Sequence, residues 1–444
     1  MNSVFTFLFT KTPLVFFAQS IWRDEAFSSL LSQKNIGEML SLTAKDSNPP
    51  LYYLLLHYWM KFFGNSEIAL RSVSLIFFCL GAYVFFLFLR NIFNHSSRRS
   101  AIYLSLFVVN PVLHYYAFEA RMYTMFGFFA LASYYFFLKK NYKFYSIFIF
   151  LGLLTHYFMI FVLLSQILYL YSVRKKTNNN KTYLRSLSIS CLLFLPWILF
   201  VLISKPSVNN SFWITKPKIE TLIQLPGIIF TGYEPGFQLQ YSILTLISIL
   251  LTIILYSVSL RTLKLKKSLH DNKSKNLILY LFIWSLFIPL IILVVSFIKP
   301  IFLPRYLIFS TMGLLLFFSY ILPKTHKFTE IALFTILITI SLIYAQIQTL
   351  TRTKANIREV AKVIKALIKP DDVVYVTHEF NFHPLQYYIN NKQIYIYGKT
   401  YEQLPWYIGK VLISPDNIAQ SLPVYPKKAF ILNDDLTFSI QATY

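Results

Sequence analysis

Glycine, cysteine and charged residues are all scarce in this sequence. Eleven glycines in 444 residues argue against a loop-rich globular protein. The two cysteines, Cys79 and Cys191, lie inside apolar segments, which excludes a disulfide framework and a zinc site built from clustered cysteines. Charged residues make up only 14% of the chain, and a soluble domain of this length needs far more polar surface to cover its core. The chain is therefore not an ordinary soluble protein.

Long apolar blocks dominate the sequence, in which 56% of the residues are hydrophobic. Most blocks are about 18 to 22 residues long, enough for a helix to cross a hydrocarbon core of about 30 Å while satisfying its own backbone hydrogen bonds. We predict a polytopic α-helical membrane protein with about eleven transmembrane helices. The first has no signal-peptide cleavage site and is expected to be retained. The predicted spans are 3–21, 68–89, 100–117, 121–138, 144–156, 157–173, 186–204, 240–260, 276–298, 304–322 and 328–348. The fifth and sixth are short and would form one helix if the chain did not break at His156.

Lysine and arginine follow a pattern that predicts orientation. The formal net charge of +24 would suggest a nucleic-acid partner in a soluble protein, but here most basic residues fall in every second loop. Basic loops face the cytoplasm. The basic loops are 90–99, 139–143, 174–185, 261–275 and 324–327, and they share one side only with eleven spans. We therefore expect the lipid bilayer and no nucleic acid as a partner, with the long loops 22–67 and 205–239 on the outer side.

The segment 350–444 differs in character from the membrane domain predicted at 1–349. Residues 356–368 have the periodicity of an amphipathic helix, and 373–376 and 393–397 have the pattern of strands. We predict a small C-terminal α/β domain, which the topology places outside the cytoplasm.

Carboxylates gather on the predicted outer side. Asp24 and Glu25 directly follow the first span, and Asp46 lies further along the same loop. Adjacent carboxylates at a membrane surface cost solvation energy and usually serve a purpose. One of the first pair could be a general base while the other binds substrate or metal, although an ordinary helix end would look the same. Asp46 or Ser47 is also expected to be the N-cap of the short apolar helix after Pro49-Pro50.

Two arginines are predicted at the outer membrane surface. Arg121 lies in a very short turn between Glu119 and Tyr123, where its guanidinium suits a bidentate contact with an anionic headgroup. Arg305 opens the tenth span, where a phosphate could bind. Both also fit arginines that pair with other loops or snorkel. His156 is a candidate ligand for substrate or metal, although a lone histidine among helices more often serves packing. The candidate substrate-binding residues are Asp46, Glu119, Arg121, Tyr123, His156, Arg305 and Tyr306.

Taken together, these motifs resemble the membrane glycosyltransferases of the GT-C type. Within that class they are most similar to the protein O-mannosyltransferases and aminoarabinose transferases, including bacterial members of family 39. The resemblance covers about residues 20 to 320 and implies a bacterial inner (plasma) membrane. The family often has His before Pro-Pro, where this chain has Asn48. The likeness depends on the order and spacing of Asp24-Glu25-Ala26, Asp46…Asn48-Pro49-Pro50-Leu51-Tyr52, Glu119-Ala120-Arg121-Met122-Tyr123, Thr155-His156-Tyr157 and Pro304-Arg305-Tyr306.

The resemblance implies transfer of a sugar from a polyprenyl-phosphate carrier to an acceptor on the outer face, which could be a glycan, a lipid or a protein. The leaving lipid phosphate needs a fixed cation, for which Arg121 and Arg305 are the candidates. The acceptor hydroxyl needs a general base, which we expect to be Asp24, supported by Glu25 or Asp46. A single displacement with inversion is expected. No nucleotide pocket is required, and the sequence has no P-loop or dinucleotide fingerprint.

Some members of this class bind a divalent ion, for which Glu25, Asp46 and His156 would be the ligands here. No ligand spacing in the sequence enforces such a site, and no other cofactor is implied. A transporter or flippase for a lipid-linked glycan is the main alternative, but it predicts internal repeats or broken helices with charges at mid-membrane. A scaffold that only presents 350–444 would leave the acidic outer loop unexplained.

Overall fold

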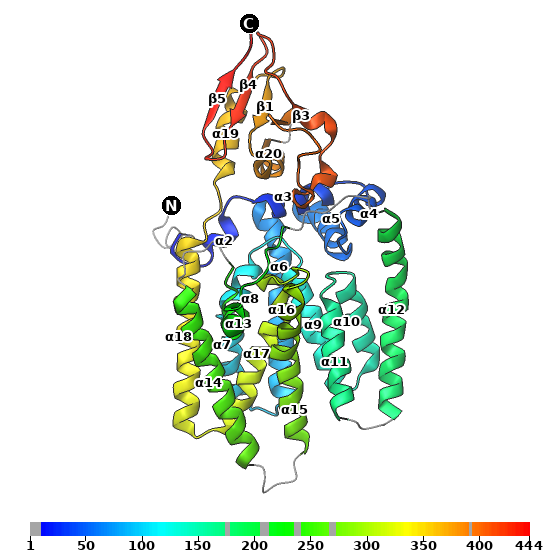
Figure 1. Cartoon of the computed structure of the whole chain (residues 1–444), viewed down its shortest axis with the longest axis vertical. Helices are drawn as coiled ribbons and strands as arrows, with labels where there is room; N and C mark the ends of the chain where they lie inside the picture. The colour runs from blue at the N-terminus through cyan, green and yellow to red at the C-terminus, as the bar shows by residue number, and fades with distance from the viewer. Residues whose placement is uncertain (1–9, 174–177, 205–212, 235–240, 266–271, 390–392) are drawn as a thin grey trace.

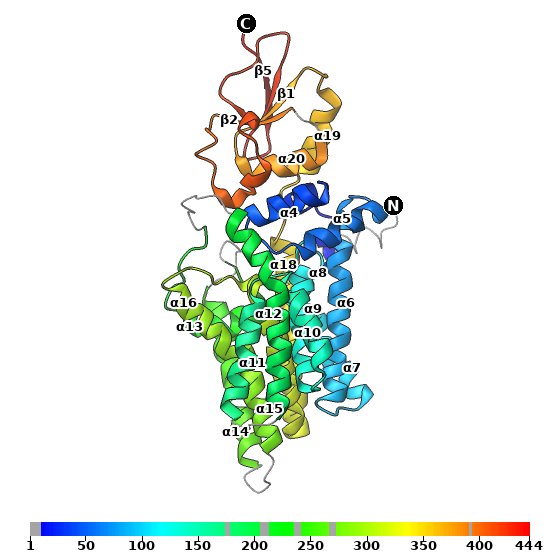
Figure 2. The ribbon, with the colours of Figure 1, turned by 90° about the vertical axis from the view of Figure 1, so that its right-hand side faces the viewer.

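The computed structural model describes residues 10–173, 178–204, 213–234, 241–265, 272–389 and 393–444. Within these residues, a long bundle of helices carries a small domain at one end (Figures 1 and 2). Six described helical segments are long and apolar enough to cross a membrane. They are α6 (Glu67–Asn91), α12 (Asn178–Ser204), α14 (Tyr241–Leu265), α15 (Asn272–Phe282) continued by η2 (Ile283–Phe287) and α16 (Ile288–Ser296), α17 (Ile308–Ile321) flanked by η3 (Pro304–Leu307) and η4 (Leu322–Lys324), and α18 (Lys327–Thr351).

Shorter apolar helices complete the bundle, with α17 at its centre, where all of the α17 residues are buried. The predicted break at His156 is present, because α10 ends at Leu153 and α11 begins at Met159. The predicted span 100–117 is instead two helices, because Pro111 follows Asn110, whose side chain caps the second helix. The shorter helices are α7 (Ser97–Val108), α8 (Pro111–Ala117), α9 (Tyr123–Leu138), α10 (Tyr142–Leu153), α11 (Met159–Val173) and α13 (Thr221–Thr231).

The predicted first span, 3–21, and the predicted outer loop 205–239 differ from the structure in their described parts. Residues 3–9 of the predicted first span lie outside the described residues. In the described part, residues 10 and 11 are helical, a turn follows, and the four-residue helix α2 (Val15–Ala18) comes next, so these residues do not form one continuous helix. The predicted outer loop 205–239 is not a loop throughout, because α13 packs against α14 and α17 inside the bundle. The predicted class, a polytopic helical membrane protein with a small C-terminal α/β domain, is confirmed.

Three helices lie between the bundle and the C-terminal domain: α3 (Arg23–Ser32), α4 (Ile36–Lys45) and α5 (Leu51–Phe63) (Figure 1). The prediction that Asp46 or Ser47 caps α5 is wrong. Asp46 is the C-cap of α4, Ser47 turns the chain with a left-handed φ of 56°, and α5 begins only after Pro50. The Leu51 amide then donates to the Leu154 carbonyl at 2.9 Å, which fixes this turn beside the end of α10.

The C-terminal domain is a five-stranded sheet in the order β3-β2-β1-β4-β5, parallel except for the antiparallel pair β4–β5. Helices α19 and α20 bury their apolar faces with Val374 and Val376 of β1. The helices and strands predicted around 356–397 are present. The elements are α19 (Ile357–Leu367), β1 (Val373–Val376), η5 (Glu379–Asn381), α20 (Phe382–Ile389), β2 (Ile394–Tyr397), η6 (Trp406–Ile408), η7 (Lys410–Leu412), η8 (Pro415–Asn417), β3 (Ile418–Ala419), β4 (Ala429–Leu432) and β5 (Phe438–Gln441).

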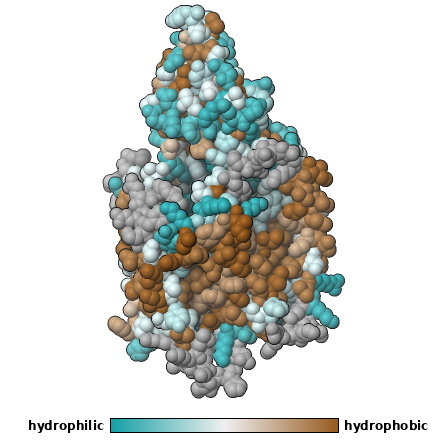
Figure 3. All heavy atoms as spheres, viewed as in Figure 1, coloured by the Kyte–Doolittle hydropathy of each residue, from teal (hydrophilic) through white to brown (hydrophobic). Residues whose placement is uncertain are grey.

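The surface matches a protein embedded in lipid. Hydrophobic residues cover the visible sides of the bundle, and polar residues dominate the C-terminal domain (Figure 3). Helices α14 and α17 end, and α15 and α18 begin, at the end of the bundle opposite that domain (Figure 1). The helix ends that border the predicted basic loops 261–275 and 324–327 therefore lie at the end of the bundle opposite the C-terminal domain.

This arrangement predicts that Ser97 and Thr400 are exposed on opposite sides of the membrane. Ser97→Cys and Thr400→Cys, each made after Cys79 and Cys191 are replaced by serine, are expected to react with a membrane-impermeant maleimide from opposite sides in sealed vesicles. Labelling after detergent lysis is the control for reactivity. Labelling of both positions from one side would contradict the predicted topology.

Candidate active site

The Asp24-Glu25 pair opens helix α3, and the helix separates the two side chains. The Trp22 amide donates to the Glu25 carboxylate at 3.4 Å in a capping-box arrangement, and both carboxylates sit in the first turn, where the helix dipole favours negative charge. Successive residues on a helix project about 100° apart. Asp24 therefore lines a cavity while Glu25 points into the protein.

Glu25, which is fully buried, is the centre of an ion-pair cluster with Arg71 and Lys354. Both of its oxygens accept from the Arg71 guanidinium, at 2.8 and 2.7 Å, and one also accepts from Lys354 Nζ at 2.9 Å. The Ala120 amide donates to the same carboxylate at 2.9 Å. Burial opposes ionisation of Glu25, but the two cations outweigh it and lower its pKa to about 2. Glu25 does not line the cavity, so this geometry favours a structural role over the catalytic role predicted for it.

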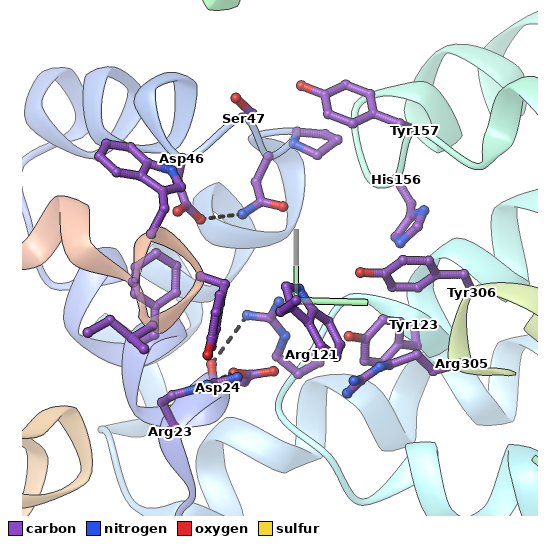
Figure 4. Close-up of a pocket in the computed structure, with 18 of the residues that line it drawn as sticks. Arg23, Asp24, Asp46, Ser47, Arg121, Tyr123, His156, Tyr157, Arg305 and Tyr306 are labelled. Atoms are coloured by element: carbon purple, nitrogen blue, oxygen red, sulfur yellow. Dashed lines mark hydrogen bonds and ion pairs between the residues drawn. The ribbon is translucent and has the colours of Figure 1, made fainter. Parts of the chain in front are cut away.

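The cavity into which Asp24 points has a volume of about 390 Å³ and lies where α3, the α4–α5 turn and the outer ends of the bundle helices meet (Figure 4). Seven of the predicted site residues line it although they are far apart in the sequence. They are Asp24, Asp46, Arg121, Tyr123, His156, Arg305 and Tyr306. The cavity is also lined by Arg23, Phe27, Ser47, Asn48, Pro49, Tyr157, Phe158, Trp213, Trp406, Tyr407, Ile408 and Gly409.

Two nearly buried arginines supply positive charge to the cavity. Arg121 donates from one terminal nitrogen to Ser28 Oγ at 2.9 Å and to the Asp24 carbonyl at 3.3 Å. Arg305 Nε lies 3.6 Å from a Glu234 carboxylate oxygen. Neither guanidinium is held by a two-point contact with a carboxylate, and guanidinium groups remain charged at any physiological pH. Both are therefore available to bind an anionic group.

The two carboxylates of the cavity have opposite ionisation behaviour. Burial raises the pKa of Asp24, but Arg23, whose Nε lies 3.0 Å away, together with Arg121 outweighs it and lowers the pKa to about 2. Burial dominates at Asp46 and raises its pKa to about 7, despite a 2.5 Å hydrogen bond from Asn48 Nδ2. Asp24 is therefore ionised throughout the physiological range, whereas Asp46 changes charge within it.

Aromatic rings form the wall of the cavity that faces Asp46 (Figure 4). His156 stacks on Phe126 with ring centroids 4.8 Å apart and lies 4.8 Å from the Tyr306 ring. Burial, with a contribution from Arg121, lowers the pKa of His156 to about 3, so its ring is neutral. The Phe158 amide donates to Nδ1 at 3.1 Å, which leaves Nε2 to carry the proton. His156 is therefore a hydrogen-bond donor at this wall.

Glu119 lies in a second cavity of about 400 Å³. Burial raises its pKa, and its Oε1 has no hydrogen-bond partner. This cavity shares Arg23 and Arg305 with the first one and is also lined by Glu234, Arg352 and Lys354. The structure does not bring Glu119 into the cavity of Asp24.

The residues proposed as metal ligands do not converge. Within the described ranges, no three histidine, cysteine or acidic side chains are grouped closely enough to hold a metal ion. Glu25 is turned toward Arg71 and Lys354, away from the cavity that Asp46 and His156 line. Glu25, Asp46 and His156 therefore do not form a binding site for a divalent ion in this arrangement.

Sequence reasoning missed three groups of residues around the site. Trp213 and the C-terminal segment 406–409 gave no signal, because aromatic residues are common throughout this chain. Arg352 and Lys354 could have been recognised from the sequence. They are basic residues at the predicted outer end of the last span, where the orientation rule predicts few basic residues.

Comparison with known proteins adds to this geometry. A model of the family described as dolichyl-phosphate-mannose-protein mannosyltransferase matches residues 47–200. No curated protein gives a significant match. The crystal structure of ArnT from Cupriavidus metallidurans bound to undecaprenyl phosphate is similar, with a TM-score of 0.63 and 13% identity over 98% of this chain and 93% of that chain. Its apo structure gives a TM-score of 0.51 and 13% identity, over 95% and 90% of the two chains.

The chain has the fold of a GT-C type membrane glycosyltransferase. The resemblance identified from the motifs is thereby confirmed. The family match spans the Asn48-Pro49-Pro50, Glu119–Tyr123 and His156 motifs, while the structural similarity to ArnT covers 98% of the chain.

Because Glu25 is buried among cations, Arg71→Met is expected to destabilise the protein strongly. Removing one partner of a buried ion pair costs about 3–5 kcal/mol. Lys34→Ala breaks an exposed 3.0 Å pair with Glu38 and is the matched control, for which little change is expected. The measurement is the thermal unfolding midpoint in detergent. Equal midpoints for the two variants would show that the cluster does not hold α3.

The raised pKa of Asp46 predicts a pH dependence. The native state holds this proton more tightly than the unfolded chain does, so the Asp46 carboxylate forms only as the pH rises through about 7. We expect acceptor kcat/KM to fall below that pH, because a protonated Asp46 accepts a hydrogen bond from a substrate hydroxyl more weakly than its carboxylate does. Asp46→Asn is expected to lower kcat/KM and flatten the profile, whereas Asp416→Asn, in an exposed position, keeps the wild-type profile. If kcat/KM of the Asp46→Asn variant still falls toward low pH as in the wild type, the titrating group is a residue other than Asp46.

Proposed function

We propose that the chain is a glycosyltransferase that moves a sugar from a polyprenyl-phosphate carrier to an acceptor hydroxyl at the outer face of the membrane. The observation that carries this proposal is the cavity at the outer end of the bundle, in which two buried arginines face an ionised carboxylate. A lipid phosphate and a hydroxyl acceptor need this pair of groups. The family match and the ArnT-like fold support the same class of reaction.

The lipid phosphate is the leaving group, and its negative charge grows as the bond to the sugar breaks. Fixed cations in a site with little water stabilise that charge without having to reorganise. Arg121 and Arg305 are 9% and 8% exposed and lie at the depth where the bundle ends. ArnT was solved with undecaprenyl phosphate bound, and we propose a polyprenyl phosphate of this kind as the carrier here.

Asp24 is proposed as the general base. The acceptor oxygen attacks the anomeric carbon, the bond from that carbon to the phosphate oxygen breaks, and the acceptor proton passes to the Asp24 carboxylate. Attack from the face opposite the phosphate inverts the anomeric configuration. A pKa of about 2 makes Asp24 a weak base in the empty cavity. A bound phosphate neutralises the surrounding arginines and raises that pKa toward the range where a base is effective.

The remaining residues are proposed to position the substrates. Asp46 accepts a hydrogen bond from the acceptor, while His156, through Nε2, and the hydroxyls of Tyr123 and Tyr306 hold the donor sugar or its phosphate. We propose a bacterial plasma membrane as the location, with the C-terminal domain outside. The five basic loops support this orientation.

Asp24→Asn keeps the shape of the side chain and removes its basicity. We expect transfer from undecaprenyl-phosphate mannose or undecaprenyl-phosphate aminoarabinose in proteoliposomes with membrane extract to fall about 10²–10⁴-fold. Binding of undecaprenyl phosphate is expected to persist, and Asp416→Asn is the control. Normal turnover by Asp24→Asn would exclude this residue as the base, and absence of transfer by the wild type with any polyprenyl-phosphate sugar would contradict the proposed function.

Arg121→Gln tests the phosphate site separately from the base. A hydrogen bond to a charged group contributes about 1.5–3 kcal/mol, so undecaprenyl phosphate is expected to bind about 10- to 100-fold more weakly. Arg98→Gln, in a basic loop at the other end of the bundle, is the control. The measurement is titration of the detergent-solubilised protein with undecaprenyl phosphate. Unchanged affinity in Arg121→Gln would place the phosphate elsewhere.

A further inference from the structure

The C-terminal domain contributes a wall of the cavity proposed as the active site. Four consecutive residues, Trp406 to Gly409, line it beside Asp24 and Asp46. They belong to η6 and the turn that follows, which approach α3 from the side away from the membrane (Figures 1 and 2). The domain is therefore part of the site, and the segment 406–409 is called the C-terminal wall below.

The C-terminal wall is held firmly against the bundle. Gly409 has a left-handed φ of 84°, and a Cβ at this position would collide with the Phe27 ring of α3. The Gly409 carbonyl lies 3.2 Å from His383 Nε2 of α20. Helix α20 is itself fixed, because the Tyr388 hydroxyl accepts from the Ile21 amide at 2.7 Å and donates to Glu67 at 2.8 Å. The wall is therefore a fixed part of the site.

Aromatic rings dominate this side of the cavity. Trp406 and Tyr407 come from the C-terminal wall, and Trp213 lies with its ring centroid 6.3 Å from that of Tyr407. The Arg23 guanidinium lies 5.8 Å from the Tyr407 ring centroid, within the range of a cation–π contact. Trp213 is 41% exposed, so part of its surface is free for a ligand.

The chemistry of the C-terminal wall suits a sugar ring. One face of a pyranose presents C–H groups, which pack on the electron-rich face of an aromatic ring, while its edge presents hydroxyls. Asp46 and Asn48 line the same cavity and offer carboxylate and amide groups to such hydroxyls. A peptide would need backbone partners at an exposed strand edge or a groove, and the wall consists of a short 3-10 turn. A hydrocarbon tail would leave the polar groups unpaired.

We propose that Trp406, Tyr407 and Trp213 form the acceptor subsite and that the acceptor is a carbohydrate. This inference rests on the proposed function and adds the class of acceptor. The lipid-linked donor enters from the membrane, and Arg121 and Arg305 bind its phosphate. The C-terminal wall belongs to the domain on the water side, so it faces the second substrate. The attacking group is then a sugar hydroxyl, whose proton goes to Asp24.

A photo-crosslinker at the C-terminal wall tests the class of acceptor without requiring turnover. The full chain carries p-benzoyl-phenylalanine in place of Trp406 and is irradiated in native membranes, and the product is analysed by mass spectrometry. The matched control carries it in place of Tyr425, which is 53% exposed on the same domain and does not line the cavity. We expect sugar fragment ions only from position 406. A product with peptide or phospholipid and no sugar, no sugar-bearing product, or equal yields from both positions would overturn the proposal.

Kinetics then separate this inference from the proposed function. With the captured carbohydrate as acceptor, Trp406→Ala is expected to raise the acceptor KM about tenfold, and Trp406→Phe is expected to restore most of the affinity. Undecaprenyl phosphate affinity should not change in either variant. Transfer with an unchanged acceptor KM in Trp406→Ala would overturn the subsite while leaving the transferase intact. Capture of a carbohydrate without any transfer would support the subsite and contradict the transferase.

Discussion

The buried carboxylate of Glu25 is the contact on which the candidate site depends. It joins the start of α3 to α6 through Arg71, to the α8–α9 turn through the Ala120 amide, and to the chain after α18 through Lys354. A charged cluster with so little exposure is stable only when each charge has its partners. Meeting that condition fixes α3, and α3 in turn fixes Asp24 at the cavity and Ser28 beside Arg121.

The two acidic residues of the cavity illustrate how position decides chemistry. Asp24 and Asp46 have the same side chain and line the same space. Asp24 has Arg23 alongside it, whereas Asp46 is bonded to the neutral Asn48 amide. The same cavity therefore holds one group that is ionised at neutral pH while the cavity is empty and one that titrates near neutral pH. Many enzymes that transfer a proton at neutral pH keep two such groups with separated pKa values.

The sequence was most informative where lipid limits the possibilities. Lipid demands helices of a certain length and composition, so most of the spans could be predicted to within a few residues, and the break at His156 proved real. The span 100–117 is an exception, because Pro111 divides it into two helices. The prediction of a cap at Asp46 failed because α4, a short amphipathic helix of mixed apolar and polar residues, was not recognised. The residue therefore ends one helix where it was expected to begin another.

The candidate site could be predicted only in part. Asp24, Arg121, His156 and Arg305 meet in one cavity, as the motifs suggested. Glu25 could not be told apart from Asp24, because the direction of each side chain depends on the helix that carries them. The C-terminal wall could not be predicted from the sequence, because Trp406 and Tyr407 resemble many other aromatic residues in the chain. Only the packing of the C-terminal domain against the bundle brings them to the site.

The Glu25–Lys354 ion pair also has a consequence for how the protein is made. The two residues are 329 positions apart, and the last span has to be synthesised before they can meet. Until then α3 carries a carboxylate that lacks one of its two cations, and the cavity lacks its C-terminal wall. Contacts of such long sequence separation form late in folding. Arg121, Arg305 and Asp24 would therefore be present before the cavity is complete, and the cavity is finished only after the C-terminal domain has been synthesised.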